Sequence, residues 1–160
     1  FGKLPFIAEA LGYITPEVEN LRRKYRYAGM KILQFAFSGG ADNPYLPFRH
    51  DRDCVVYTGT HDNDTSLGWY QELAPEDRAR VDEYLGHPTE PMPWPLIRAA
   101  LASRAYLAII PMQDLLALDG DHRMNVPGTA EGNWAWRFLW DRVPADLSAK
   151  VRRMVEIYGR

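Results

Sequence analysis

The sequence predicts an α/β fold built from parallel βαβ units. Short apolar runs recur four times along the 160 residues, and stretches with helical periodicity follow them. Strands that are apolar on both faces are typical of a parallel sheet covered by helices. A complete (β/α)8 barrel needs about 250 residues, so four units correspond to half of a barrel. A small doubly wound sheet is the competing topology.

The first apolar run is LPFIA at residues 4–8, and a helix start follows it. Thr15 is a good N-cap, and Pro16 is favoured at the first helical position. This helix should end near residue 29. Its expected buried face comprises Val18, Leu21 and Tyr25.

Two further runs, residues 30–37 (MKILQFAF) and 54–57 (CVVY), are predicted strands. The turn-rich sequence SGGADNPYLP follows the first, and TGTHDNDT follows the second. Helices are expected at residues 65–73 and 75–85, because the periodicity returns there and Gly86 can end the second helix.

The last third of the chain begins after four prolines at residues 88–95, which predict an extended loop. A helix at residues 95–103 and a fourth apolar run at 106–110 come next. The last helix, residues 145–158, has four apolar side chains at helical spacing: Leu147, Val151, Met154 and Tyr158.

The composition excludes several classes of protein. Hydrophobic residues make up 46% and the net charge is −2, which is ordinary for a globular domain and gives no overall attraction to nucleic acid or a membrane. No apolar run approaches the ~20 residues that span a bilayer. Cys54 is the single cysteine, so an internal disulfide is excluded and a buried apolar role is expected for it. Because the chain starts at Phe1 in strand-like sequence, we interpret it as part of a longer protein.

Candidate reactive groups follow the predicted strands, since the carboxyl ends of parallel strands meet at one edge. Glu9 follows the first run, and His61 and Asp62 follow the third. Two carboxylates facing one another suit glycosidic-bond chemistry, and the neighbouring loops are rich in aromatic rings that can stack on sugars. The structural alternatives are that Glu9 caps a turn or pairs with an arginine, that His61 is a structural histidine, and that Trp134 and Trp136 pack in the core.

Other motifs give no support for metal or cofactor chemistry. The acidic loop that starts at Asp62 lacks the glycine and glutamate that an EF-hand calcium loop requires at its sixth and twelfth positions. The sequence contains no phosphate-binding loop, dinucleotide-binding glycine fingerprint, HExxH or CxxC. We therefore expect neither a metal nor an organic cofactor.

Four stretches, taken together, resemble one family. They are PFIAEALGYITPEVENLR at residues 5–22, YTGTHDNDTSLGWY at 57–70, QDLLAL at 113–118 and RMNVPGTAEGNWAWRF at 123–138. In this order they resemble the 4-α-glucanotransferases, the amylomaltases or disproportionating enzymes of glycoside hydrolase family 77. The resemblance implies a retaining transglycosylase on a (β/α)8 TIM barrel that moves α-1,4-glucan segments between maltooligosaccharide or starch-like chains.

The resemblance also implies roles for four residues. The family's general acid/base corresponds to Glu9, and its transition-state-stabilising carboxylate corresponds to Asp62 of GTHDN. The sugar-binding histidine corresponds to His61. Asn133 of GNW is expected near the rim of the active site.

One essential group has no counterpart in this chain. The family's nucleophile is an aspartate in a motif resembling RIDHF after the fourth strand, and no such motif occurs here. Residues 1–160 are therefore expected to be the C-terminal half of the catalytic barrel, strands five to eight, which needs its N-terminal half and is inactive alone. A cytoplasmic location is expected, or a plastid if a transit peptide precedes the chain.

Two other functions remain open at this point. An α-amylase-like hydrolase shares the histidine–aspartate pair after the seventh strand and differs mainly in using water as the acceptor. A non-catalytic glucan-binding module would use the tryptophans for stacking.

Overall fold

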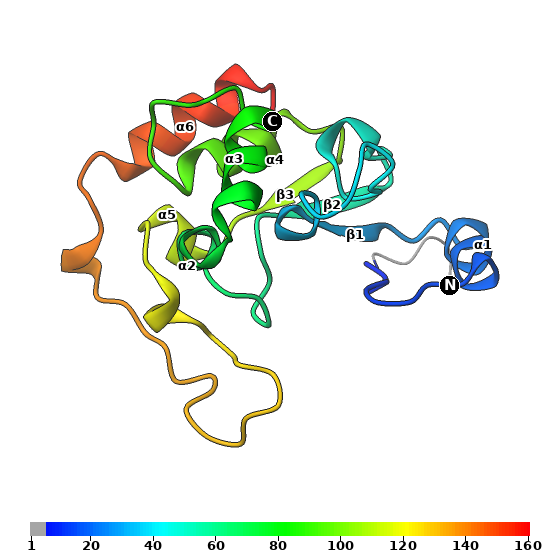
Figure 1. Ribbon diagram of the computed structural model, residues 1–160, viewed down its shortest axis with the longest axis horizontal. Coiled ribbons are helices and arrows are strands. Elements are labelled where there is room, and N and C mark those ends of the chain that lie inside the picture. The colour runs from blue at the N-terminus through cyan, green and yellow to red at the C-terminus, as the bar shows by residue number, and fades with distance from the viewer. Residues whose placement is uncertain (1–5) are drawn as a thin grey trace.

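Three short strands form a parallel sheet, with β2 (Cys54–Tyr57) between β1 (Gly29–Ile32) and β3 (Leu107–Ile109) (Figure 1). The computed structural model describes residues 6–160. The segment before Glu9 also runs parallel to β1, through a single bridge between Ile7 and Ala28. The predicted α/β class with a parallel sheet is confirmed.

Within residues 6–160, six α-helices accompany the sheet. They are α1 (Pro16–Lys24), α2 (Ser66–Glu72), α3 (Pro75–Tyr84), α4 (Trp94–Ala102), α5 (Met112–Leu115) and α6 (Leu147–Ile157). In Figure 1, α3, α4 and α6 gather on one side of the sheet, α1 lies apart at one end, and the chain between α5 and α6 makes a long excursion. The predicted helices at residues 65–73, 75–85, 95–103 and 145–158 are confirmed to within about two residues.

Helix α4 joins the two parts of the hydrophobic core. Leu96 on one face packs in a cluster with Val56 of β2, while Ile97 packs in a second cluster with Leu147 and Met154 of α6. A helix that is apolar around most of its circumference is expected to be buried on several sides. The apolar face predicted for residues 145–158 is confirmed, because it contacts this second cluster.

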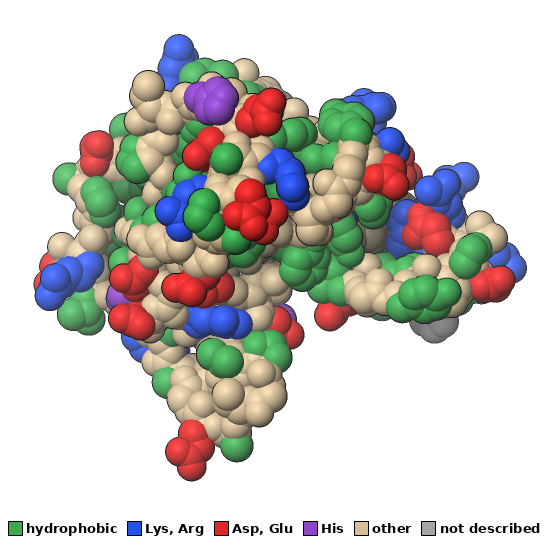
Figure 2. Space-filling view, in the orientation of Figure 1, with side chains coloured by type: hydrophobic (Ala, Val, Ile, Leu, Met, Phe, Trp, Pro, Cys, Tyr) green, Lys and Arg blue, Asp and Glu red, His purple; other side chains and the backbone are tan. Residues whose placement is uncertain are grey.

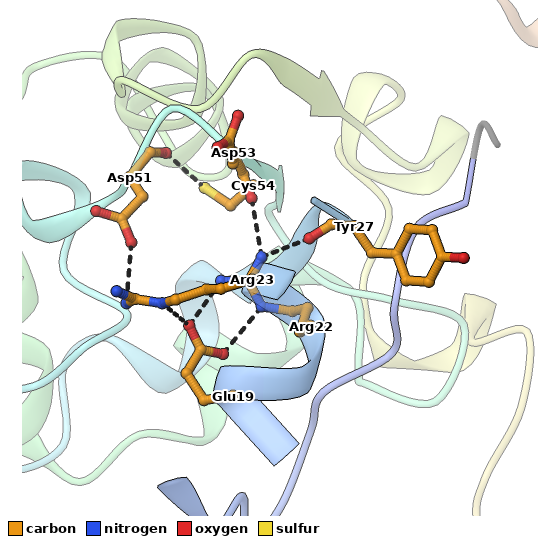
Figure 3. Close-up of polar contacts among 7 residues, drawn as sticks. All are labelled: Glu19, Arg22, Arg23, Tyr27, Asp51, Asp53 and Cys54. Carbon is orange, nitrogen blue, oxygen red and sulfur yellow. Dashed lines mark hydrogen bonds and ion pairs between the residues drawn. The ribbon is translucent and has the colours of Figure 1, made fainter. Parts of the chain in front are cut away.

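The prediction for the first helix was right about its start and wrong about its buried face. Val18, Leu21 and Tyr25 are all exposed. The reason is that α1 is attached through its polar side (Figure 3). Arg22 forms two hydrogen bonds to Glu19, at 2.7 and 2.9 Å, and donates to the carbonyls of Tyr27 and Asp53.

Three predicted strands differ from expectation. Only the first part of residues 30–37 is strand, because the chain turns into a 3-10 helix at Leu33–Phe35. Strand β3 is exposed at Leu107 and Ile109, since it lies at the edge of the sheet. In the first run, residues 4 and 5 lie outside the described part, and Ile7 forms a single bridge rather than a strand.

The surface has no dominant charge. Figure 2 shows acidic and basic side chains interspersed over the visible face. Between residues 6 and 160, every helix is too short or too polar to cross a membrane.

We predict that the core depends on both faces of α4. Leu96→Ala and Ile97→Ala should each lower the free energy of unfolding by about 2–5 kcal/mol, the cost of a core cavity. The matched control is Tyr13→Ala, whose side chain is 95% exposed and should have little effect. Urea unfolding of the three variants tests this, and a loss below 1 kcal/mol for either core variant would contradict the assignment.

We also predict a pH-dependent contribution from Glu19. Hydrogen bonds from Arg22, together with those from Arg23, lower the pKa of Glu19 to about 2. A carboxyl whose pKa falls on folding stabilises the folded state above its unfolded pKa, and this stabilisation is lost as the pH falls through the folded value. Glu19→Gln should therefore reduce the loss of thermal stability between about pH 4.5 and pH 2.

The measurement is the melting temperature at several pH values, for the wild type and Glu19→Gln. Glu76→Gln, at an exposed position in the first turn of α3, is the matched control. Identical pH profiles for the wild type and Glu19→Gln would refute the role of the Glu19–Arg22 pair.

Candidate active site

The loop of residues 58–65, between β2 and α2, carries His61 and Asp62 at the carboxyl end of β2. Both side chains are about half exposed, at 51% and 50%. The loop is held by its own polar side chains: Asn63 Oδ1 accepts hydrogen bonds from the backbone N–H and the hydroxyl of Thr60, at 2.9 and 2.7 Å. At its far end, Thr65 caps α2 by accepting the Gly68 N–H at 3.0 Å.

Asp62 is held by a second segment of the chain. Its Oδ1 atom accepts a hydrogen bond of 2.7 Å from Asn125 Nδ2, and Arg123 donates to its backbone carbonyl at 3.0 Å. His61 Nε2 lies 3.3 Å from the same Oδ1 atom. The carboxylate thus has a fixed orientation and keeps an exposed side from which a ligand can approach.

An aromatic ring covers one face of His61. The Trp134 ring lies 4.9 Å from the imidazole, centroid to centroid, with 41° between the planes. Trp134 has a φ of +63°, in the left-handed region that costs an ordinary residue about 1–2 kcal/mol. Such strain is concentrated at functional sites. Trp134 is exposed, so its default interpretation as a core residue was wrong.

His61 and Trp134 border a cavity of about 220 Å³. Its lining includes His61, Asp64, Gln113, Arg123 and Trp134. Polar donors and acceptors therefore alternate with aromatic surface, a combination that suits a polyhydroxylated ligand.

The close approach of α2 to the next 3-10 helix, Gly120–His122, depends on two glycines. A Cβ atom on Gly68 would lie 2.7 Å from the backbone nitrogen of Gly120, and one on Gly120 would lie 3.1 Å from the carboxylate of Asp64. This contact positions the start of the segment that delivers Arg123 and Asn125 to Asp62.

A buried carboxylate lies beneath the loop. Asp114 of α5 accepts hydrogen bonds from the hydroxyls of Thr58 and Ser66 at 2.5 and 2.7 Å, and from the Ser66 N–H at 2.8 Å. Burial raises the pKa of Asp114, and these three hydrogen bonds oppose the shift. In the sequence, Asp114 follows the fourth apolar run and lies in the QDLLAL stretch, but neither feature indicated that its side chain is buried beneath the 58–65 loop.

Glu9 lies on a separate segment, next to β1. Its side chain is exposed. It lies two residues after Ile7, which forms a parallel bridge with Ala28, the residue directly before β1. Burial of the Tyr57 phenol raises the pKa of Tyr57, the last residue of β2, and the negative charge of Glu9 adds to this shift. In the described part of the chain, Glu9 is not among the contacts that join His61, Asp62 and Asn125.

Asn133 stabilises the shape of its own loop. Its Oδ1 atom accepts the Val126 N–H at 2.9 Å, and its Nδ2 atom donates to the Thr129 carbonyl and hydroxyl, each at 3.0 Å. The side chain thus closes residues 126–133 into a compact turn next to Trp134.

Sequence reasoning did not assign a role to Asn125 or Arg123, although both lie in RMNVPG. Their contribution depends on a contact 61 to 63 residues away in the chain, which local patterns do not reveal. Within the described residues, no three His, Cys, Asp or Glu side chains are grouped so that they could hold a metal ion.

We predict that Asn133→Ala loosens the 126–133 turn. One net hydrogen bond is worth about 0.5–1.5 kcal/mol, so amide exchange at Val126 should become roughly 2- to 12-fold faster. Hydrogen exchange read by NMR or mass spectrometry measures this. Unchanged protection of Val126, with Glu131→Gln as a control in the same turn, would show that the turn does not depend on Asn133.

Comparison with known proteins gives a consistent result. The 4-alpha-glucanotransferase family, Glyco_hydro_77, matches residues 1–141. The 4-alpha-glucanotransferase of Synechocystis sp. is 52% identical over 98% of this chain and 32% of its own length. That of Thermus thermophilus is 48% identical over 100% of this chain and 34% of its own length.

Solved structures agree with this match. The amylomaltase from Streptococcus agalactiae in complex with acarbose has a TM-score of 0.96 and 35% identity, over 99% of this chain and 32% of that one. The chain spans about a third of the length of these proteins. From its sequence and its fold, the chain belongs to the 4-alpha-glucanotransferase family.

Proposed function

We propose that this chain supplies part of the active site of a 4-α-glucanotransferase, which transfers α-1,4-glucan segments to the 4-hydroxyl of another glucan or of glucose. The observation that supports this most strongly is the orientation of Asp62. Its carboxylate is held by Asn125, next to a histidine whose ring lies against Trp134, at the carboxyl end of a parallel strand. Because the chain belongs to the 4-alpha-glucanotransferase family, we interpret this arrangement as part of a site for glycosyl transfer.

In the proposed mechanism, Glu9 is the general acid/base. It donates a proton to the leaving glycosidic oxygen in the first step and removes one from the acceptor hydroxyl in the second, as retaining enzymes require. The segment that carries Glu9 bridges in parallel to Ala28, directly before β1, and the Glu9 carboxylate lies close enough to Tyr57, the last residue of β2, to contribute to the raised pKa of that phenol. This arrangement supports the assignment.

Asp62 remains ionised in this mechanism and stabilises the positively charged, oxocarbenium-like sugar. His61 donates a hydrogen bond to hydroxyls of the glucose at the cleavage point, and the neighbouring Trp134 ring limits its rotation. Asn133 contributes at the rim, through the turn that it holds.

For the fold, we propose that residues 1–160 are the C-terminal half of a (β/α)8 barrel, strands five to eight. The order β1-β2-β3 runs in one direction across the sheet, with the bridged segment before β1. A doubly wound sheet would reverse direction at a switch point, so the sequential order supports the barrel.

The nucleophile and the N-terminal half of the barrel must then come from outside this chain, which spans about a third of its relatives. Residues 1–160 alone are expected to be inactive. The proposed substrates are maltooligosaccharides and starch or glycogen fragments, a class supported by the acarbose complex of the amylomaltase from Streptococcus agalactiae. The proposed location is the cytoplasm, or a plastid where a transit peptide is present.

We predict that Glu9→Gln and Asp62→Asn each lower the transfer rate of the full-length enzyme by at least ~10²-fold. Each variant keeps the size and hydrogen-bonding shape of its side chain and removes the charge. Glucose release from maltotriose measures the rate. The matched controls are Glu76→Gln on α3 and Asp141→Asn, both exposed. A rate within threefold of the wild type for either site variant would remove that residue from the mechanism.

A further inference from the structure

The loop that carries His61 and Asp62 is attached to the rest of the protein at both ends by one side chain. Thr58 directly follows β2, and Ser66 is the first residue of α2. Both donate hydrogen bonds to the carboxylate of Asp114, which lies 48 to 56 residues away in the sequence. The two ends of the loop therefore share one fixed point.

This fixed point is in the interior. Asp114 is 1% exposed, and Thr58 and Ser66 are fully buried. Buried hydroxyls and N–H groups that lose their hydrogen-bond partners destabilise the folded state, because water cannot replace those partners. Separation of the loop ends from Asp114 would therefore be unfavourable in free energy. These hydrogen bonds fix the position of the loop relative to the sheet.

The interior of the loop has further support from β1. Gln34, in the 3-10 turn that follows β1, donates from Nε2 to the Asp64 carbonyl at 2.8 Å. Asp62 lies in the middle of this loop, and its carboxylate accepts a hydrogen bond from Asn125. A displacement of the loop ends would therefore move the Asp62 carboxylate relative to Asn125.

We propose that Asp114 is a positioning residue that sets the location of Asp62 and His61 through its hydrogen bonds to Thr58 and Ser66. The inference rests on the proposed function, in which Asp62 stabilises the transition state. A misplacement of about 1 Å in a reacting group can cost ~10²-fold in rate, so a loop held at both ends has a direct kinetic consequence.

Two substitutions separate the shape of Asp114 from its charge. Asp114→Ala removes all three acceptor contacts. Asp114→Asn can keep them, because its Oδ1 atom still accepts the Ser66 N–H while its amide group donates to the hydroxyls of Thr58 and Ser66, which can rotate to accept. Val81→Ala, a fully buried change in α3, is the control for a general loss of stability.

The experiment uses the full-length enzyme and measures kcat and KM on maltotriose, the melting temperature, and hydrogen exchange of residues 60–64. We expect Asp114→Ala to lower kcat by at least about 10-fold and to speed exchange in the loop. Asp114→Asn should retain kcat within about threefold, because the hydrogen bonds persist. Val81→Ala should lower the melting temperature while leaving kcat and loop exchange unchanged.

A double variant tests whether Asp114 acts through Asp62. In the Asp62→Asn background, Asp114→Ala should lower kcat by less than about threefold more, because residues that act as one unit are not additive. A full second loss of 10-fold or more would overturn the inference. So would a kcat for Asp114→Ala equal to that of Val81→Ala at the same melting temperature.

The rate of Asp62→Asn distinguishes a failure of the proposed function from a failure of the positioning role of Asp114. If Asp62→Asn has the wild-type rate, the catalytic role of Asp62 is wrong whatever Asp114 does. Hydrogen exchange then still decides whether Asp114 positions the loop: faster exchange at residues 60–64 in Asp114→Ala supports the positioning, and unchanged exchange overturns it.

Discussion

The parallel pairing of β2 with both β1 and β3 is the constraint on which the site depends. Because the three strands run in the same direction, the segments that leave them emerge at one edge. Gln34 after β1, the 58–65 loop after β2 and Asp114 after β3 therefore meet, although 80 residues separate the first from the last. In an antiparallel sheet these three segments would leave from alternating ends, and no single carboxylate could hold both ends of the loop.

Local chemistry made the helices and the central strand predictable. Helix starts at Pro16 and Pro75, and the uniformly apolar run at residues 54–57, follow from short-range preferences that the tertiary structure leaves intact. The same logic located His61 and Asp62 after a strand. The family motifs then added their proposed roles, which strand patterns alone could not supply.

Features that depend on distant contacts were not predictable. Val18, Leu21 and Tyr25 have the periodicity of a buried face, yet an arginine anchor on the other side of α1 turns them to the solvent. Asn125 and Asp114 lie in stretches that resemble the family, but their positions in the structure depend on hydrogen bonds across 48 to 63 positions, which local patterns do not reveal. The helical periodicity of apolar residues predicts a buried face only where another part of the protein packs against that face.

The central claim is that the site transfers glucan segments to a sugar acceptor rather than to water. The most direct measurement is the product distribution of the full-length enzyme on maltotriose, followed by chromatography over time. The account predicts glucose together with maltopentaose and longer chains, since each transfer lengthens one chain as it shortens another. Glucose and maltose alone, with no product longer than the substrate, would contradict it and indicate a hydrolase.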